Sequence, residues 1–511
     1  MKQMSNKIKN IIMPGFLLPA IAGGITGALI FLFKLAANCV ISGSGRIYTF
    51  VRANPFFLPI LIIGAILIAF ASYLFRRFDE TSAGGGISTS IAIVRGVLSF
   101  RWFRNLVSVF CAAMLSYFVG VPLGNEGPSV QMGTAIGSGT SNIFAKKSKA
   151  WHRYVMTGSA SAGFGAATGA PLSGILFALE ELQERISPMI FLSASSAVAA
   201  SYGVSELLCL LTGKSSALFH LSVGVTLPMK NLWMVLVVGV MCGLAAVLFA
   251  KCHTAFGTFL RRKGDKLPVF LKLTSVFLFV SVIGYFFAEC LGSGHDLIEV
   301  LFEGDGVWYM LLLILVLRML LMLTANNIGV TGGLFVPNLT FGALIGALCA
   351  ILFRSIGILS SEYCVILVTV AMSAYLCANS CIPITALCFG IEVLCGGKNI
   401  LSFAVAVLAS YAVVKLLKSK TCDEISIERR EEEYAEKAGN RIFGEYEVGK
   451  DSFAVGKLKS DLPLPFGSEI SGKTKGIIKC GDVLKVSCFA EDKKALEEIF
   501  GKQPEESASV A

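Results

Sequence analysis

Residues 124–137, Gly-Asn-Glu-Gly-Pro-Ser-Val-Gln-Met-Gly-Thr-Ala-Ile-Gly, decide how the rest of this chain is interpreted. One carboxylate, Glu126, stands between two glycines and a proline inside a strongly apolar region. Pro128 suits the first turn of a helix, because its φ is already near a helical value and the N–H that it lacks would be unpaired there. We therefore expect Glu126 to lie just before a helix start. Helix N-termini attract anions, so this carboxylate is predicted to occupy a place that an external anion could take.

Long apolar stretches around this segment indicate a polytopic membrane protein. The chain has 511 residues, of which 55% are hydrophobic and only 15% are charged. Segments 16–43 and 55–75 are each long enough to span a bilayer. Short basic clusters bound the apolar segments, so we attribute the net charge of +10 to cytoplasmic loops and expect no nucleic-acid partner. Residues 1–15 carry three lysines and no cleavage signal, so we expect a cell-membrane protein whose N-terminus, like its C-terminus, is cytoplasmic.

Cysteine and histidine usage gives no sign of a metal or cofactor site. The fifteen cysteines are scattered singly, with no Cys-x-x-Cys spacing, and the four histidines form no ligand pattern. We expect buried, reduced thiols and predict no metal and no cofactor. An intramembrane serine hydrolase would need a positioned base, and we find no histidine accompanying Ser138 or Ser173 at a usable repeat position. The chain is therefore not expected to be an enzyme.

Short apolar segments between the long ones predict broken or re-entrant helices. Several, such as 171–183 and 382–396, are under ~17 residues and cannot cross the hydrocarbon alone. Irregular backbone at membrane depth is tolerated where it lines protein or a watery cavity. The glycine-interrupted pieces therefore point to a transport site.

An internal repeat relates the two halves of the apolar region. Glycines follow Pro128 by five and nine residues, and they follow Pro337 at the same two offsets. Pro171 is followed nine residues later by Glu180, and Pro383 in the same way by Glu392. Duplicated transporter folds show this pattern. We predict two repeats, at about 16–215 and 229–418, and the spacing alone leaves open whether they are parallel or inverted.

The chain changes character after the second repeat. Residues 419–440 contain a dense run of charge and are predicted to form a solvated helical linker. Residues 441–501 are predicted to form a small α+β cytoplasmic domain, with strands at 477–478 and 483–489 and a terminal amphipathic helix at 493–500. Residues 502–511 are predicted to be a disordered tail.

An anion pathway needs partial positive charge without a tightly fixed cation, so that ions can leave as well as enter. Backbone N–H groups at converging helix N-termini supply it. Three glycine-rich breaks, at 84–87, 124–127 and 332–335, let the backbone approach an ion closely. A buried, unpaired carboxylate costs several kcal/mol or becomes protonated. Glu126 is therefore predicted to alternate between a charged state that blocks the anion site and a protonated state that leaves it, and so to carry a proton.

Three stretches resemble motifs of the CLC family of chloride channels and chloride/proton antiporters. Residues 124–128 resemble its Gly-Arg/Lys-Glu-Gly-Pro motif, which bears the gating glutamate. Residues 332–337, Gly-Gly-Leu-Phe-Val-Pro, resemble its Gly-x-Phe-x-Pro motif, whose backbone amides face the anion. Residues 170–181 resemble the helix that ends in paired glutamates, and the proton-relaying second glutamate of the antiporters matches Glu181. The resemblance runs from about residue 16 to 418.

The resemblance implies a fold, a function and a set of site residues. The fold would be an all-α polytopic membrane protein with inverted repeats, assembled as a homodimer with one pathway per subunit. The function would be chloride/proton antiport, with Glu126 as gate and external proton site and Glu181 as internal proton relay. The anion-binding residues would be Gly85, Gly86, Ile87, Asn125, Gly127, Leu334 and Phe335.

Two departures from the family pattern concern the central anion site. The family motif Gly-Ser-Gly-Ile-Pro reads Gly-Gly-Gly-Ile-Ser here, so Gly85 replaces the serine whose hydroxyl holds the anion. The family's tyrosine at this site aligns with 421–424, Thr-Cys-Asp-Glu, where there is no tyrosine. The nearest candidates to replace these contacts are Ser88, Thr89 and Thr331. Loss of both hydroxyls favours leak, so a passive chloride channel is one alternative function.

A third departure keeps fluoride open as the transported anion. Asn125 replaces the basic residue before the glutamate, and fluoride-exporting relatives also carry Asn there. Those relatives tend to have Met where Gly85 stands, which argues against a full match. A cation transporter would need helix C-termini or carboxylate rings facing the pathway, and the glycine-rich helix starts argue for the opposite sign.

The C-terminal domain resembles the ligand-binding TrkA-C module of potassium-transport regulators. Phe453-Ala-Val-Gly-Lys457 and Cys480-Gly-Asp-Val-Leu-Lys-Val486 carry this resemblance. It implies a regulatory role and a possible small-molecule ligand.

Overall fold

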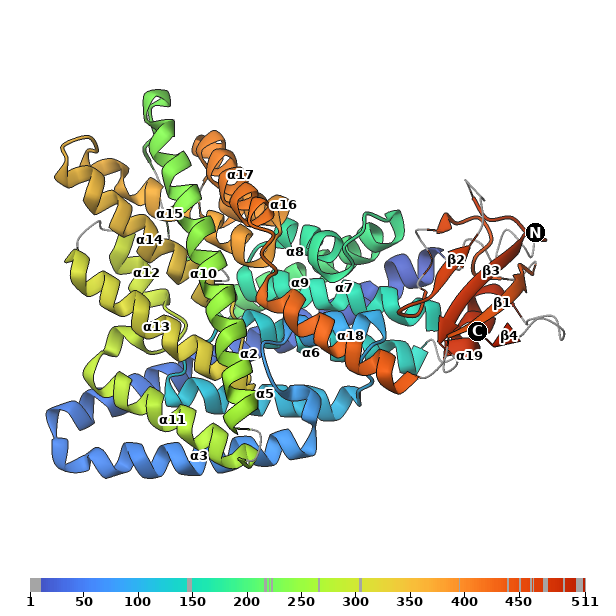
Figure 1. The fold of residues 1–511 in the computed structure, drawn as a ribbon, viewed down its shortest axis with the longest axis horizontal. Helices are drawn as coiled ribbons and strands as arrows, with labels where there is room; N and C mark the ends of the chain where they lie inside the picture. Colours follow the sequence, from blue (N-terminus) through green and yellow to red (C-terminus); the bar gives the residue numbers. More distant parts are fainter. Residues whose placement is uncertain are drawn as a thin grey trace.

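The structure is a computed structural model that describes most of the chain. It covers residues 11–511 except 145–148, 216–217, 220, 222–223, 265–266, 303–305, 395, 439–440, 450–451, 460–461, 463, 472–476, 490–491, 502–508 and 511. Figure 1 shows a large helical body and, at one end, a small sheet formed by the last part of the chain.

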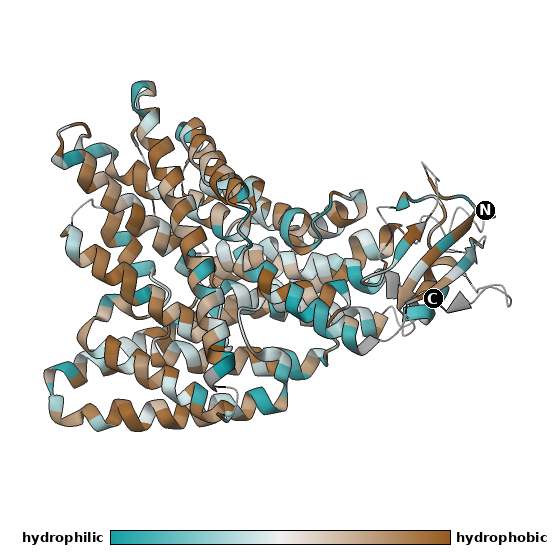
Figure 2. Cartoon of the chain, viewed as in Figure 1, coloured by the Kyte–Doolittle hydropathy of each residue, from teal (hydrophilic) through white to brown (hydrophobic). Residues whose placement is uncertain are grey.

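Ten helices among the described residues are long and apolar enough to cross a membrane. Their side chains are predominantly hydrophobic along the helical body, whereas α18 and the C-terminal region are more hydrophilic (Figure 2). This confirms the prediction of a polytopic membrane protein. These helices are α2 (Leu18–Ala53), α3 (Leu58–Phe78), α5 (Trp102–Val119), α9 (Pro188–Thr212), α10 (Leu232–Gly264), α11 (Val269–Phe286), α13 (Trp308–Ile328), α14 (Phe335–Ser355), α15 (Cys364–Ser380) and α17 (Ile400–Leu416).

Shorter helices lie between them, as the interrupted apolar pattern predicts. Two of these begin at a proline, which supplies the helical φ of the first turn, and the first of the two continues as a π-helical turn over Ala178–Leu182. The shorter helices are α4 (Ile87–Arg95), α8 (Pro171–Phe177), α12 (His295–Phe302) and α16 (Pro383–Glu392). Two further helices, α6 (Glu126–Phe144) and α7 (Lys149–Thr168), are as long as some of the ten but are not among the membrane-span candidates.

The repeated glycines have the same structural reason in both halves. A Cβ at Gly133 would overlap the carbonyl oxygen of Ser159, because α6 packs directly on α7. A Cβ at Gly342 would stand 2.5 Å from the carbonyl oxygen of Ala371, because α14 packs on α15 in the same way. The glycines therefore allow two equivalent helix pairs to approach backbone to backbone.

The repeated glutamates bind each other's helix start. Glu180, after α8, accepts hydrogen bonds from the N–H groups of Ile384 and Thr385 at the start of α16, at 3.0 and 2.7 Å. Glu392, at the end of α16, accepts hydrogen bonds from the N–H groups of Leu172 and Ser173 at the start of α8, at 2.9 and 3.0 Å. The two helices pack against each other and run antiparallel, as inverted repeats require.

The region after α17 differs from the predicted solvated linker at its first turn. Helix α18 (Cys422–Ala438) packs on α4, and Cys422 and Ile427 are buried there. The apolar spacing of these residues gives α18 one buried side, although most of its residues are charged. Its first turn is therefore part of the helical body.

The C-terminal sheet is small and antiparallel, with strand order β2-β3-β1-β4. Its strands are β1 (Arg441–Glu447), β2 (Glu469–Ser471), β3 (Val483–Phe489) and β4 (Ser509–Val510), and α19 (Lys493–Phe500) packs on β1. The prediction of α19 is confirmed. The expected strand at 477–478 is wrong, because Ile477 forms only an isolated bridge with Leu458. Within the expected disordered tail, Ser509–Val510 pair with β1, and 502–508 and 511 lie outside the described residues.

Candidate functional site

The three glycine-rich breaks meet in space. Gly124 and Gly333 exchange two backbone hydrogen bonds of 2.7 Å each and form an isolated antiparallel bridge. The N–H of Gly332 donates to the carbonyl oxygen of Gly84 at 3.3 Å. Segments more than 200 residues apart in the sequence are thus joined through their main chains.

Glycine is required where these breaks touch. A Cβ at Gly127 would overlap the carbonyl oxygen of Gly85, and a Cβ at Gly86 would overlap the carbonyl oxygen of Gly127. Gly86 also has φ of +83°, which residues with a side chain rarely adopt. The close approach of the three breaks therefore depends on the absence of side chains.

A helix begins at each break. Helix α4 starts at Ile87, α6 at Glu126 and α14 at Phe335, so Glu126 is the first residue of its helix and not the residue before it. The first N–H groups of a helix have no partner inside that helix. Among the described residues, the N–H groups of Ile87, Leu334 and Phe335 have no backbone acceptor. The site thus collects unpaired donors and the positive ends of three helices.

The Glu126 carboxylate is buried within this cluster. The residue has no exposed surface, and within the part of the chain that the structure describes neither carboxylate oxygen has a hydrogen-bond partner. The carboxylate turns back over Gly124, and the N–H of Val336, in the first turn of α14, is one of the donors near it. A negative charge here lies at the starts of two helices.

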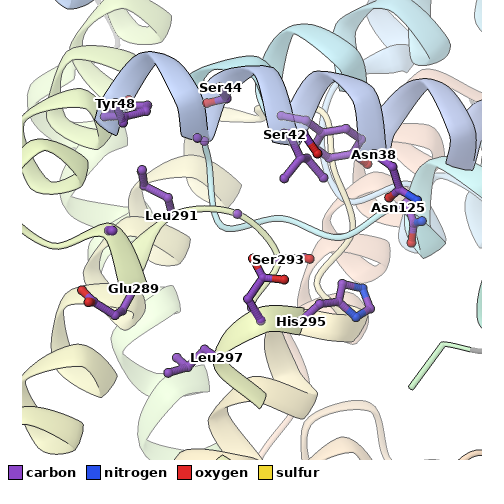
Figure 3. Close-up of a pocket in the computed structure, with 18 of the residues that line it drawn as sticks. Asn38, Ser42, Ser44, Tyr48, Asn125, Glu289, Leu291, Ser293, His295 and Leu297 are labelled. Atoms are coloured by element: carbon purple, nitrogen blue, oxygen red, sulfur yellow. The ribbon is translucent and has the colours of Figure 1, made fainter. Parts of the chain in front are cut away.

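A polar cavity of about 950 Å³ opens next to this cluster. Its lining includes Lys34 and Tyr48 of α2, Asn125 beside Glu126, and Ser293 and His295 at the start of α12. Figure 3 shows Asn38, Asn125 and His295 around this space, under helix α2. The cavity gives a polar approach to the break that contains Glu126.

Lys34 is a site residue that the sequence interpretation missed. It is the only lysine or arginine within the long apolar stretch 16–43, and its charge acts on Glu126. The signal was present, because an ionisable residue inside an apolar span is a functional hypothesis by default. Nothing in the local sequence says that α2 passes beside residue 126.

The three hydroxyls considered as replacement anion contacts have different surroundings. Ser88 bonds with the carboxylate of Asp423, at the start of α18. Thr331 donates to the carbonyl oxygen of Ser82 at 2.8 Å. Thr89 is buried with no partner for its hydroxyl. Two of the three hydroxyls are therefore already engaged with protein groups.

Glu181 lies near Asp423, at the start of α18. It is 8% exposed, and its carboxyl group is surrounded by acidic neighbours, with Asp423 acting most strongly, followed by Glu180 and Glu184. Burial raises the pKa of the Asp423 carboxyl, and the hydrogen bond from Ser88 opposes that shift. Two carboxyl groups, Glu181 and Asp423, thus stand close together at the end of α8.

The structure brings together all seven residues predicted to bind the anion. Gly85, Gly86 and Ile87 lie at the start of α4, Asn125 and Gly127 at the start of α6, and Leu334 and Phe335 at the start of α14. The Phe335 ring packs between Phe164 and Phe389, with ring centroids 5.0 and 5.2 Å away. This packing fixes the start of α14. The part of these residues in anion binding stays a prediction.

One detail of the sequence interpretation is wrong. His152 lies beside Ser138, with the hydroxyl 3.3 Å from Nε2, because the packing of α6 on α7 brings the two positions together. Ser173 is bound to Glu392 at 2.8 Å. Among the described residues there is no group of three metal-ligating side chains.

The fold and the converging helix starts define a class of polytopic transport proteins with a buried site at broken helices. Residues 64–415 match the family described as "Voltage gated chloride channel". Because the match covers more than half of the chain, the protein belongs to this family.

Relatives and solved structures agree with this assignment. The H(+)/Cl(-) exchange transporter ClcA of Klebsiella pneumoniae (strain 342) is 28% identical over 437 residues, covering 83% of this chain and 91% of that protein. A slow cyanobacterial Cl-/H+ antiporter superposes with a TM-score of 0.73 at 24% identity, covering 83% of this chain and 99% of the other. A CLC-type fluoride/proton antiporter superposes with a TM-score of 0.66 at 21% identity, covering 79% of this chain and 96% of the other. The two solved structures show the fold.

Proposed function

We propose that this protein exchanges chloride for protons across the cell membrane, with Glu126 as the gate. The observation that carries the proposal is the Glu126 carboxylate, buried without a hydrogen-bond partner at the converging starts of α6 and α14. The relatives named above as H(+)/Cl(-) exchange transporters support the same activity.

The chemistry follows from a competition for one place. When charged, Glu126 takes the position at the helix starts and excludes a mobile anion. When protonated, it loses its attraction to the N–H groups and is free to turn toward the polar cavity. Chloride then enters among the unpaired N–H groups, which bind it without a fixed cation and so allow it to leave. One carboxylate thereby couples anion entry to a proton.

Glu181 supplies the second proton site of the proposed cycle. It lies near Asp423, at the start of α18. Burial favours its neutral form, and its acidic neighbours Asp423, Glu180 and Glu184 add to this, since like charges disfavour ionisation. A group that readily holds a proton can pass it toward Glu126 while chloride follows a separate course.

Two specific observations favour alternatives within the same fold. Gly85 and Asp423 leave the central site without the serine and tyrosine hydroxyls of the family pattern, which favours a passive chloride channel. Asn125 and the structural likeness to a fluoride/proton antiporter favour fluoride as the anion. Antiport is preferred because Glu181 is retained.

The test is proton movement in liposomes that contain the purified full-length protein. An imposed chloride gradient should drive protons uphill, and Glu126→Gln should abolish this movement, because a neutral amide cannot carry a proton. Glu362→Gln, a change at an exposed residue, is the matched control and should leave the coupling intact. Passive anion flux with no uphill proton movement would establish the channel instead, and parallel measurements with fluoride and nitrate would rank the anions.

The assembly and the tail are part of the same proposal. We infer a homodimer with one pathway per subunit, both termini in the cytoplasm, and lipid around the apolar helices. The region 441–501 acts as a TrkA-C-like regulatory domain with a small-molecule ligand. An antiparallel sheet with a packed terminal helix supports a ligand-binding module, and the contacts of this region with α7, through α19 and through Leu464, are the proposed route by which binding could alter the pathway.

A further inference from the structure

The glycine breaks are tightly packed except beside Gly84, where a Cβ would meet nothing within 4 Å, and beside Gly85. A Cβ placed at Gly85 would meet nothing closer than 4.0 Å, in contrast to Gly86 and Gly127. The two nearest atoms, both at 4.0 Å, are the carbonyl oxygen of Gly332 and Oδ1 of Asn326. Space for a small group therefore exists next to the start of α4. The Gly332 carbonyl would repel an anion in this space, so a side-chain donor is needed for an anion to stay.

Asn326 reaches this space from the end of α13. Its side chain is partly buried, and Nδ2 lies 3.0 Å from Nε2 of His253, on α10. His253 is itself buried, at 7% exposure, and its Nδ1 has no hydrogen-bond partner among the residues that the structure describes. The amide is thus held between the imidazole on one side and the gap at Gly85 on the other.

The two orientations of the Asn326 amide differ in cost. With Nδ2 toward the imidazole, Nε2 accepts, so the neutral ring carries its proton on Nδ1, where a buried N–H has no acceptor. With the amide turned by 180°, Nε2–H donates to Oδ1, and the unpartnered Nδ1 is only an acceptor. Orphaned buried N–H groups are rarer than orphaned acceptors. The second orientation directs the Nδ2 donor into the gap at Gly85.

We propose that Asn326, oriented by His253, donates the side-chain hydrogen bond to the anion beside Gly85. This inference rests on the proposed anion transport and names a contact that the glycine at position 85 does not supply. Ser88 and Thr331 are engaged elsewhere, as shown above. An amide is a neutral donor, so it binds a monovalent anion without trapping it.

Chloride binding to the purified full-length protein, measured by titration calorimetry, tests this assignment. Asn326→Ala should weaken chloride binding about tenfold, the value of one hydrogen bond to a charged group. Adding Gly85→Ser to that variant should restore most of the affinity, because the gap admits a Cβ, and the serine hydroxyl would supply the missing donor. Asn327→Ala is the matched control. Asn327 Nδ2 donates to the carbonyl oxygen of Leu323 at 3.0 Å and to the main-chain carbonyl oxygen of His253 at 3.4 Å, and neither contact involves the His253 ring or the gap at Gly85. Chloride binding by this variant should match that of the unchanged protein.

The outcomes separate the inference from the function on which it rests. If the unchanged protein binds neither chloride nor fluoride, the proposed anion transport fails and the inference falls with it. If the unchanged protein binds chloride and Asn326→Ala binds it equally well, only the assignment of Asn326 is overturned. Equal losses in both asparagine variants would also overturn it. Where Asn326→Ala does not elute as a folded protein, Asn326→Leu gives the same readout with the side-chain shape preserved.

Discussion

At the residue scale, the candidate site depends on glycine positions, where the absence of a side chain lets the backbone segments touch. Gly127 and Gly85 lie against each other, yet only one of them leaves space for a Cβ. Gly127→Ala should therefore separate the starts of α4 and α6 and destabilise the protein by about 1–3 kcal/mol, the usual cost of overpacking. Thermal unfolding in detergent measures this, and Gly85→Ala is the matched control that should unfold like the unchanged protein. Equal melting temperatures for all three proteins would contradict the packing described here.

Lys34 offers a second test at this scale. It lines the polar cavity and acts on Glu126 from α2. A cation in a low-dielectric entrance raises the local concentration of anions. Lys34→Gln should therefore raise the KM for chloride several-fold and weaken its dependence on ionic strength, with kcat changed less.

Flux measured at several chloride concentrations and two salt levels separates these effects. The matched control is Lys398→Gln, at an exposed lysine far along the chain, which should leave the KM unchanged. An unaltered KM in Lys34→Gln would remove Lys34 from the anion's path.

At the element scale, α8 and α16 stabilise each other through exchanged caps. Each glutamate binds two N–H groups and one hydroxyl of the opposite helix, the hydroxyls belonging to Thr385, at 2.7 Å, and Ser173, at 2.8 Å. A carboxylate at a helix start combines capping with a favourable dipole. Glu180→Ala and Glu392→Ala should each cost about 1–2 kcal/mol, and the double variant should lose roughly the sum.

The measurement is again thermal unfolding, with the exposed Glu299→Ala as control. The two single variants should lose similar amounts of stability, since the contacts that they remove are equivalent. Transport coupling in Glu180→Ala should remain, because its neighbour Glu181 is the proposed proton relay. If Glu180→Ala folds stably but has lost uphill proton movement, then Glu180, and not Glu181, is the proton relay.

Element starts could be predicted from sequence, because their causes are local. Prolines and glycine breaks set the beginnings of α6, α8 and α16. The glycines repeated after Pro128 and Pro337 mark the helix pairs that pack closely. Partners across the fold could not be predicted. The link from Glu180 to Thr385 spans 205 residues, and that from Asn326 to His253 spans 73. No local pattern encodes such contacts, so Lys34 and Asn326 were missed and α18 was predicted to be solvated.

At the scale of the whole molecule, the C-terminal unit is attached to the pathway through α4. Arg153 of α7 donates to the carbonyl oxygen of Leu464 in that unit and to the carbonyl oxygen of Arg95 at 3.0 Å. Arg95, the last residue of α4, also pairs with Glu431 of α18 at 3.3 Å. The N-terminal end of α4, at Ile87, lies at the glycine breaks. One short helix, together with Arg153, therefore connects the glycine breaks to the C-terminal unit.

This connection predicts that the half-buried Arg153 holds the C-terminal unit in place. Arg153→Met keeps the apolar stem and removes the donors, which leaves two carbonyl groups without their partner. Opening of the unit should become about tenfold more frequent, the equivalent of one lost hydrogen bond of ~1.4 kcal/mol. Limited proteolysis after α18 should accelerate to the same extent, while Arg429→Met, which removes an exposed ion pair with Glu433, should not change it. If the C-terminal unit regulates transport through α4, Arg153→Met should also change the chloride flux, while the proton coupling that depends on Glu126 remains. Faster proteolysis with an unchanged flux would show that the C-terminal unit is docked but does not regulate transport.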